Sequence, residues 1–149
     1  MYSRIAALAG ILAGGVLAGC SRAPADTRNT AETAATYKAG YGIRLNEQAA
    51  AFAGIELGEA ESRDLPGVMG ATVVPQSALL RTVRGAFVYV ENGEWLLRSP
   101  VRTGVEASGH IEVIEGLYEG DRIATSGVKA LWLAEISAVN GGVGCADGH

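Results

Sequence analysis

The dipeptide Asn92-Gly93 restricts the fold of this chain more than any other feature, because it separates two short runs of apolar and aromatic residues. Both residue types tolerate the positive φ angles that a tight hairpin turn requires. We therefore predict a β-hairpin formed by residues 86–90 and 94–98. Pro100 has no backbone N–H to donate, so we expect the second strand to break there or to lie at a sheet edge. A third strand is expected to begin within residues 101–105.

The same reasoning predicts further short strands wherever aliphatic and β-branched residues lie between turn-forming residues. They are residues 43–45, 55–57, 72–74, 111–114 and 122–125. A short helix is expected between Asn46, as its N-cap, and Gly54, as its left-handed C-terminal residue, with Phe52 on its apolar face. Residues 128–136 fit either a short helix or a buried strand. This pattern predicts a mainly β fold, a small barrel or sandwich with one short helix.

The first twenty residues have the layout of a secretory signal, with Arg4 before an apolar stretch that is too short to span a bilayer. The ending LAGC resembles the lipobox of bacterial lipoproteins, so we expect cleavage before Cys20 and attachment of lipid to its sulfur. Such an anchor holds a protein on the periplasmic face of a membrane, inner or outer. We expect a signal peptide (1–19), a flexible tether (20–40), a folded domain (41–138) and a loose tail (139–149).

The charge and the motifs narrow the classes of function. A formal net charge of −4 disfavours nucleic acid as a partner. The sequence has two imidazoles, His110 and His149, and it lacks the motifs of a serine nucleophile elbow or a phosphate-binding loop. We therefore predict no enzyme activity and no nucleotide cofactor.

Two groups of residues are candidates for binding. Cys145, Asp147 and His149 combine ligand types that suit zinc or copper, although a closed zinc site needs about four ligands. A weak metal site and a terminal segment without any ligand both remain open. Trp95 and Tyr89, on the predicted hairpin, are candidate partner-docking residues, and packing in the core or at its rim is the alternative.

Several stretches together resemble the periplasmic adaptor subunits, or membrane fusion proteins, of RND-type efflux pumps, above all their heavy-metal branch. They are VPQSALL, GAFVYVENGEW, RSPVRTGVEASGHIEVIEGLYEGDRIATSG and YGIRLNEQAAAFAGIELGEAE. The resemblance covers roughly residues 41–135 and implies the membrane-proximal domain of that family, a circularly permuted SH3-like β fold. It assigns a turn and docking scaffold, in which Leu117 points inward and Asp121 bonds the turn's own backbone. The scaffold residues are Gly116, Leu117, Gly120, Asp121 and Gly127.

The chain also departs from this family. Adaptors carry a β-barrel, a lipoyl-like domain and a long helical hairpin between the equivalents of Leu65 and Val73, whereas residues 66–72 cover that gap here. The resemblance therefore implies a lipid-anchored, adaptor-like subunit of an RND system for metal cations, which docks on the transporter or on a full-length adaptor. The alternatives are a periplasmic metal-binding lipoprotein that uses the Cys145/His149 tail, and a truncated adaptor that no longer functions.

Overall fold

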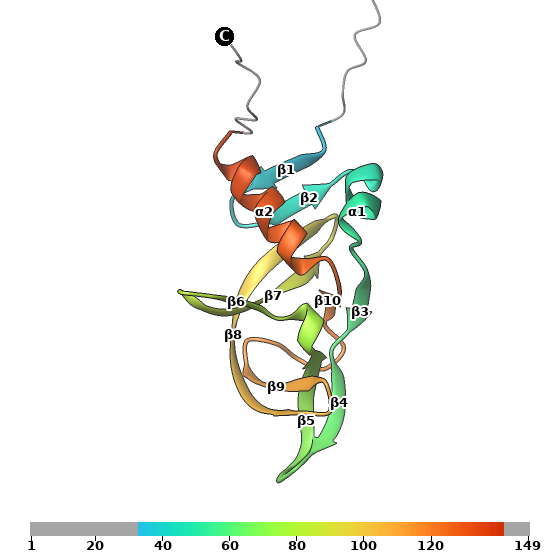
Figure 1. The fold of residues 1–149 in the computed structure, drawn as a ribbon, viewed down its shortest axis with the longest axis vertical. Helices are drawn as coiled ribbons and strands as arrows, with labels where there is room; N and C mark the ends of the chain where they lie inside the picture. The colour runs from blue at the N-terminus through green and yellow to red at the C-terminus, as the bar shows by residue number, and fades with distance from the viewer. Residues whose placement is uncertain (1–32, 142–149) are drawn as a thin grey trace, which may run out of the picture. The chain divides into compact units, whose positions relative to one another are not determined.

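The computed structural model describes residues 33–141, and within them the chain forms ten strands and two α-helices (Figure 1). The strands are β1 (Ala35–Lys38), β2 (Gly42–Leu45), β3 (Leu57–Glu59), β4 (Glu61–Leu65), β5 (Val68–Pro75), β6 (Leu80–Thr82), β7 (Gly85–Asn92), β8 (Trp95–Ala107), β9 (His110–Glu115) and β10 (Arg122–Ala124). The helices are α1 (Glu47–Ala53) and α2 (Val128–Val139), with a 3₁₀ turn at Gln76–Ala78. The predicted mainly β class is confirmed.

The main sheet is a curled antiparallel half-barrel with the strand order β3-β10-β7-β8-β9-β5-β4. Its two end strands are consecutive in the chain, since only Ala60 separates β3 from β4. The Ala60 N–H donates to the carbonyl oxygen of Asp121, and the Ala60 carbonyl accepts from the N–H of Gly120, both at 2.9 Å. One bent segment therefore joins both ends of the sheet. The interior of the half-barrel is filled by aliphatic residues that include Val74, Val88, Ile111 and Ile123.

The predicted hairpin is formed by β7 and β8, but its turn is shifted by one residue. Asn92 is paired with Trp95, so Gly93 and Glu94 are the central turn residues, and Gly93 has a φ of +64°. Glycine at the first central position is the requirement of a type II′ turn, whereas the prediction placed Asn92 there.

Pro100 does not break the second strand, and the expected third strand at residues 101–105 is the continuation of β8. The strand pairs with β2 at Leu96 and with β9 from Arg102 onward, so Pro100 lies between these two contacts. A residue without an N–H is tolerated where a strand passes from one neighbour to another. β8 thus connects the part of the sheet that contains β2 and β7 with the part that contains β9 and β5.

The predicted tether, residues 20–40, includes a strand of the folded domain, so its C-terminal bound is wrong. β1 lies within residues 20–40 and pairs antiparallel with β2, with Ala35 opposite Leu45 and Lys38 opposite Gly42. The segment has no large aliphatic residue, but Ala35 packs against the core and backbone pairing with β2 orders the rest. The remainder of the tether, residues 20–32, the signal peptide and residues 142–149 of the tail lie outside the described residues.

The short helix α1 begins and ends as the sequence predicts. The side chain of Asn46 accepts the N–H of Ala49 at 2.8 Å, and Gly54 has a φ of +63°. The expected apolar face is wrong, however, because α1 buries none of its residues and the Phe52 side chain is 95% exposed. Its end residues, rather than burial of a side chain, define this helix.

Residues 128–136 belong to the helix α2, so the structure has two α-helices instead of one. Val128, Leu131 and Glu135 are its buried residues, and their spacing places them on one side of the helix. This side packs over β1 and β2 (Figure 1), where Leu131 joins Ile43 and Tyr89 in a second core. Neither helix among residues 33–141 is long and apolar enough to span a membrane.

Candidate functional site

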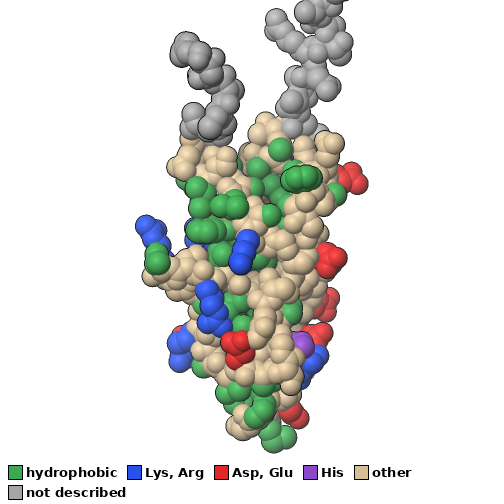
Figure 2. Space-filling model, viewed as in Figure 1, with side chains coloured by type: hydrophobic (Ala, Val, Ile, Leu, Met, Phe, Trp, Pro, Cys, Tyr) green, Lys and Arg blue, Asp and Glu red, His purple; other side chains and the backbone are tan. Residues whose placement is uncertain are grey.

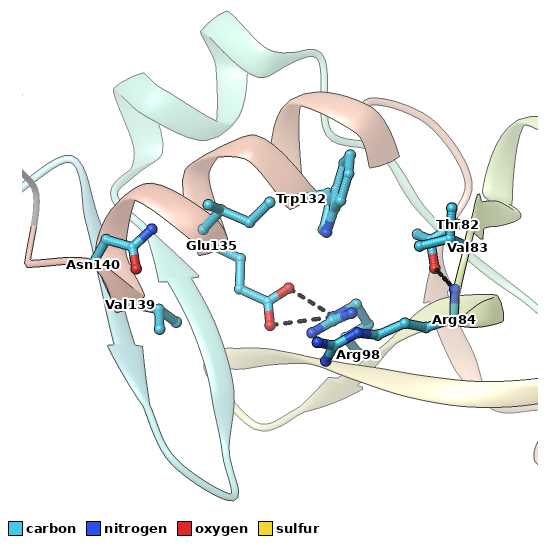
Figure 3. A pocket seen from close by; sticks show the side chains of 9 residues that line it. Thr82, Val83, Arg84, Arg98, Trp132, Glu135, Val139 and Asn140 are labelled. Carbon is cyan, nitrogen blue, oxygen red and sulfur yellow. Dashed lines mark hydrogen bonds and ion pairs between the residues drawn. The ribbon is translucent and has the colours of Figure 1, made fainter.

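A groove of about 450 Å³ lies between α2 and the turn that joins β6 to β7 (Figure 3). Trp132, Ile136 and Val139 form its apolar wall, and their i, i+4, i+7 spacing places them on one helical face. Val83, at the tip of the turn, lines the other side and is fully exposed. Apolar side chains thus border the groove from two separate elements.

The β6–β7 turn holds its tip by local hydrogen bonds. The hydroxyl of Thr82 accepts the backbone N–H of Arg84 at 3.1 Å and donates to the carbonyl oxygen of Gly85 at 3.3 Å. Gly85 has a φ of +124°, which favours glycine. This local bonding keeps Val83 and Arg84 at the rim of the groove.

A largely buried cluster of Tyr89, Arg98 and Glu135 lies beside the groove, and Arg98 and Glu135 line it. Tyr89 on β7 and Arg98 on β8 are register partners, so their side chains lie on the same sheet face. The hydroxyl of Tyr89 donates to the carboxylate of Glu135, and the Arg98 Nε forms an ion pair with this carboxylate at 3.0 Å. Burial, followed by the hydrogen bond to Glu135, raises the pKa of Tyr89 above its ordinary value, so the hydroxyl stays a donor at pH values at which an exposed tyrosine loses its proton. The cluster fixes α2 over the sheet.

The groove carries more positive than negative charge. Arg84 and Arg98 both line it, and Glu135 is the one carboxylate among its lining residues (Figure 3). In Figure 2, Lys and Arg side chains lie beside and below the hydrophobic side chains of the α2 face, whereas Asp and Glu lie along the edge of α1, β3 and β4. A segment that combines apolar residues with an acidic one fits such a groove.

The turn that the family resemblance singled out has the expected local geometry. Gly116 and Gly120 have φ angles of +95° and +85°, and the Asp121 carboxylate accepts the backbone N–H of Tyr118 at 2.8 Å. Leu117 points inward and is 5% exposed in the half-barrel core. The turn lies against Ala60, away from the groove residues, so its part in docking stays a prediction.

Gly127, the last residue of that predicted scaffold, acts on the groove indirectly. It precedes α2 with a φ of +68°, and a Cβ there would lie 2.6 Å from the carbonyl oxygen of Ala53. A glycine is therefore needed where α2 starts beside the end of α1.

Of the two aromatic residues predicted to dock a partner, Tyr89 is completely buried, and this contradicts its prediction. Its neighbour Val88 points into the half-barrel, so the ring of Tyr89 points to the opposite face of β7, which α2 covers. Trp95 is half-buried and does not line the groove, so its role remains a prediction. The sequence reasoning missed Glu135, although its spacing from Val128 and Leu131 places a lone carboxylate on the buried helix face.

The predicted lipid-bearing Cys20 and the predicted metal ligands Cys145, Asp147 and His149 lie outside the described residues. Within residues 33–141, no three His, Cys, Asp or Glu side chains come close enough together to hold a metal ion. The metal interpretation of the tail therefore stays a prediction.

Comparison with known proteins gives a family match for part of the chain. Residues 72–131 match the model of the CzcB C-terminal circularly permuted SH3-like domain. This range includes the β6–β7 turn and Arg98 but ends inside α2, before Trp132 and Glu135.

An NMR structure covers 180 residues of SilB from Cupriavidus metallidurans CH34, with its N-terminal metal-binding site and membrane proximal domain. Its sequence is 22% identical to that of this chain, and the two structures superpose with a TM-score of 0.42. The similarity covers 64% of this chain and 56% of the SilB chain, so the chain spans little more than half of that structure. No curated protein gives a significant match.

Proposed function

Residues 72–131 belong to the CzcB C-terminal circularly permuted SH3-like domain family, the membrane-proximal domain of heavy-metal RND adaptors, and from this premise we propose that the chain is an adaptor-like subunit of an RND efflux system. The family match is the observation that carries this proposal. The subunit acts by binding a protein partner and catalyses no reaction.

The proposed docking surface is the groove between α2 and the β6–β7 turn, and its proposed occupant is a periplasmic segment of the RND transporter. An apolar wall, an exposed Val83 and the two arginines that line the groove, Arg84 and Arg98, suit a segment with aliphatic side chains and an acidic residue. The acidic edge of α1, β3 and β4 repels such a segment and favours approach from the α2 face.

A lipid anchor on Cys20 would hold this subunit at the periplasmic face of the membrane. The motif LAGC after the apolar stretch supports this part of the proposal. The exported cargo would be a metal cation, as the heavy-metal branch of the family implies. The chain joins β4 to β5 through Pro66 and Gly67 alone, with Leu65 paired to Val68. We propose that the subunit is accessory to a complete adaptor, which would bridge to the outer membrane.

Crosslinking in the native envelope tests the proposal. The tagged, full-length protein would be crosslinked mildly, and the captured proteins identified by mass spectrometry. We expect an RND transporter among them, with capture reduced about tenfold by Arg84→Glu, since a charge reversal replaces an attraction by a repulsion. Arg63→Glu, on the exposed face of β4, is the matched control and should leave capture unchanged.

Two outcomes would contradict the proposal. Failure to capture any RND transporter with a folded and abundant protein would remove the adaptor function and leave the metal-binding lipoprotein or the inactive adaptor. Equal loss of capture in Arg84→Glu and Arg63→Glu would keep the partner but reject the groove as the docking surface.

A further inference from the structure

A continuous row of two cations and two aromatic rings lies on β1, β2, the turn between them and the start of β8. The Lys38 Nζ is 3.7 Å from the centroid of the Tyr41 ring, and the centroids of Tyr41 and Trp95 are 6.3 Å apart. The guanidinium carbon of Arg44 is 5.1 Å from the centroid of Trp95. Tyr41 is 46% exposed, and Lys38 and Arg44 are also exposed. The row is therefore open to solvent.

This row occupies the sheet face that α2 does not cover. Ile43 is completely buried in the core with Leu131 of α2, and successive side chains of a strand point to opposite faces. Arg44 therefore points away from α2. Leu96 is paired with Ile43 and packs in the same core, so its neighbour Trp95 shares the outer face with Arg44.

A further exposed aromatic residue lies at the same end of the domain. Phe52 belongs to α1, which contacts β2 and lies beside it in Figure 1. Its side chain is 95% exposed, and the helix buries none of its other residues. Single exposed hydrophobic residues are common on protein surfaces, so Phe52 does not by itself extend the row.

The combination of side chains matches the interface of a lipid bilayer. Tyrosine and tryptophan are enriched at headgroup level because one end of each ring system is polar, and lysine and arginine attract anionic headgroups. Glu94 pairs with Arg44 at 3.2 Å, and both side chains are largely exposed. Such an exposed pair is weak, so Arg44 can exchange Glu94 for a lipid phosphate.

The proposed anchor limits how far this face can lie from a membrane. Fourteen residues separate Cys20 from Ala35 at the start of β1. Even a fully extended chain of this length reaches only about 50 Å. Tethering over such a distance gives an effective concentration of the order of millimolar, so a weak surface affinity is sufficient for contact.

We infer that the face formed by Lys38, Tyr41, Arg44 and Trp95 contacts the lipid headgroups of the membrane that holds the anchor. This inference rests on the proposed lipid anchor. It places the α2 groove, on the other side of β1 and β2, away from the headgroups and open to a protein partner.

Quenching of tryptophan fluorescence tests the inference on the complete, processed protein. The protein purified from membranes would be reconstituted into vesicles of phosphatidylethanolamine and phosphatidylglycerol, with part of the lipid brominated near the headgroup end of its acyl chains. The chain has two tryptophans, so Trp95→Phe and Trp132→Phe assign the signal. We expect loss of most of the Trp95 emission and a blue shift of what remains, with little quenching of Trp132.

Surface variants then test the chemistry of the contact. Lys38→Ala should weaken the contact about fivefold, the effect of about 1 kcal/mol for one cation near an anionic surface. Tyr41→Ser should reduce quenching of Trp95 as well. Tyr118→Ser is the matched control, because this tyrosine is 80% exposed on the turn between β9 and β10. It should leave the quenching unchanged.

The outcomes separate this inference from the proposals on which it rests. Protein that floats with the vesicles while Trp95 remains unquenched has an anchor but no lipid contact at this face, and the inference is then wrong. Protein that does not float lacks the anchor, and the inference loses its premise and is rejected with it. Protection of Trp95 only after addition of a purified transporter would assign the row to a protein partner and overturn the inference.

Discussion

Tyr89 and Glu135 meet in the core although 46 residues separate them in the chain. The tyrosine hydroxyl donates to the carboxylate, and Arg98, the register partner of Tyr89, completes the cluster with an ion pair. The Glu135 carboxylate is only 7% exposed, and burying such a charge costs free energy unless it is paired. The cluster therefore holds α2 in one position over β7 and β8. The wall of the groove depends on that position.

Removal of this carboxylate should therefore destabilise the fold. Glu135→Ala leaves the Tyr89 hydroxyl and the Arg98 guanidinium without their acceptor, and we expect a loss of about 2–3 kcal/mol in the free energy of unfolding. Arg98 is 31% exposed and regains some hydration, which limits the loss. Glu135→Gln keeps an acceptor of the same shape and should cost less. Urea denaturation measures both values.

Glu115→Ala is the matched control for Glu135→Ala. Glu115 also pairs with an arginine, Arg102, and the hydrogen bond from that guanidinium holds the pKa of Glu115 below its usual range. Both partners are exposed, so water replaces the contact and the urea midpoint should stay nearly unchanged. Equal destabilisation by the two substitutions would show that burial does not determine the effect.

Stability at high pH should depend on Tyr89. Burial, and then the hydrogen bond to Glu135, raise the pKa of Tyr89 above the ordinary tyrosine value of about 10. Above this pH the unfolded state loses the proton and the folded state keeps it, so the free energy of unfolding falls as pH rises. Below it the contribution of Tyr89 is fully present. Tyr89→Phe should therefore show a shallower loss of stability above a pH of about 10.

The control for this pH dependence is Tyr118→Phe, because the Tyr118 ring is exposed. Its stability should follow that of the unaltered protein across the alkaline range. Near neutral pH, Tyr89→Phe should cost about 1 kcal/mol, since Glu135 then lacks one donor. Parallel alkaline curves for Tyr89→Phe and the unaltered protein would contradict the prediction.

Local features of the fold could be predicted from the sequence because neighbouring residues determine them. Asn46 and Gly54 mark the ends of α1 through hydrogen bonds and backbone conformation within one helical turn. Leu117 and Asp121 belong to a tight turn whose glycines favour one geometry. Short-range alternation and turn residues also placed the expected strands 43–45, 72–74, 111–114 and 122–125, which coincide with β2, β5, β9 and β10. The strand expected at residues 55–57 shares only Leu57 with β3, and β4 and β6 were not predicted.

Features that depend on distant partners could not be predicted in this way. β1 is a strand because β2 offers it a backbone edge, although residues 35–38 lack large aliphatic side chains. Phe52 lies on a face that resembles a buried one, but nothing among residues 33–141 covers it. Tyr89 is buried rather than exposed because α2 packs over it, and the sequence left open whether residues 128–136 form a helix.

The two turn glycines should differ in their tolerance of a side chain. Both have φ angles that disfavour other residues, so Gly120→Ala, which meets no atom within 4 Å, should cost about 1–2 kcal/mol of strain. A Cβ on Gly116 would additionally collide with the carbonyl oxygen of Pro100. Thermal unfolding of the two variants should therefore show a larger loss for Gly116→Ala. A similar loss for both would reject the collision as the cause.

Gly104 should be intolerant of substitution for a different reason, because its backbone is not in the left-handed region. The carboxylate of Glu112 lies directly over its Cα, where it accepts the N–H of Val105 at 2.8 Å beside a register shift of β8. Gly104→Ala would displace this carboxylate and should cost about 1–3 kcal/mol.

A double-mutant cycle with Glu112→Ala can identify the cause of that loss. Once the carboxylate is absent, a Cβ at Gly104 meets mainly the flexible end of the Ile114 side chain, which can move. Gly104→Ala should then cost about 1 kcal/mol less in the Glu112→Ala background than alone, a coupling typical of residues in contact. Additive losses would mean that Gly104 is required for the backbone of β8 rather than for the carboxylate above it.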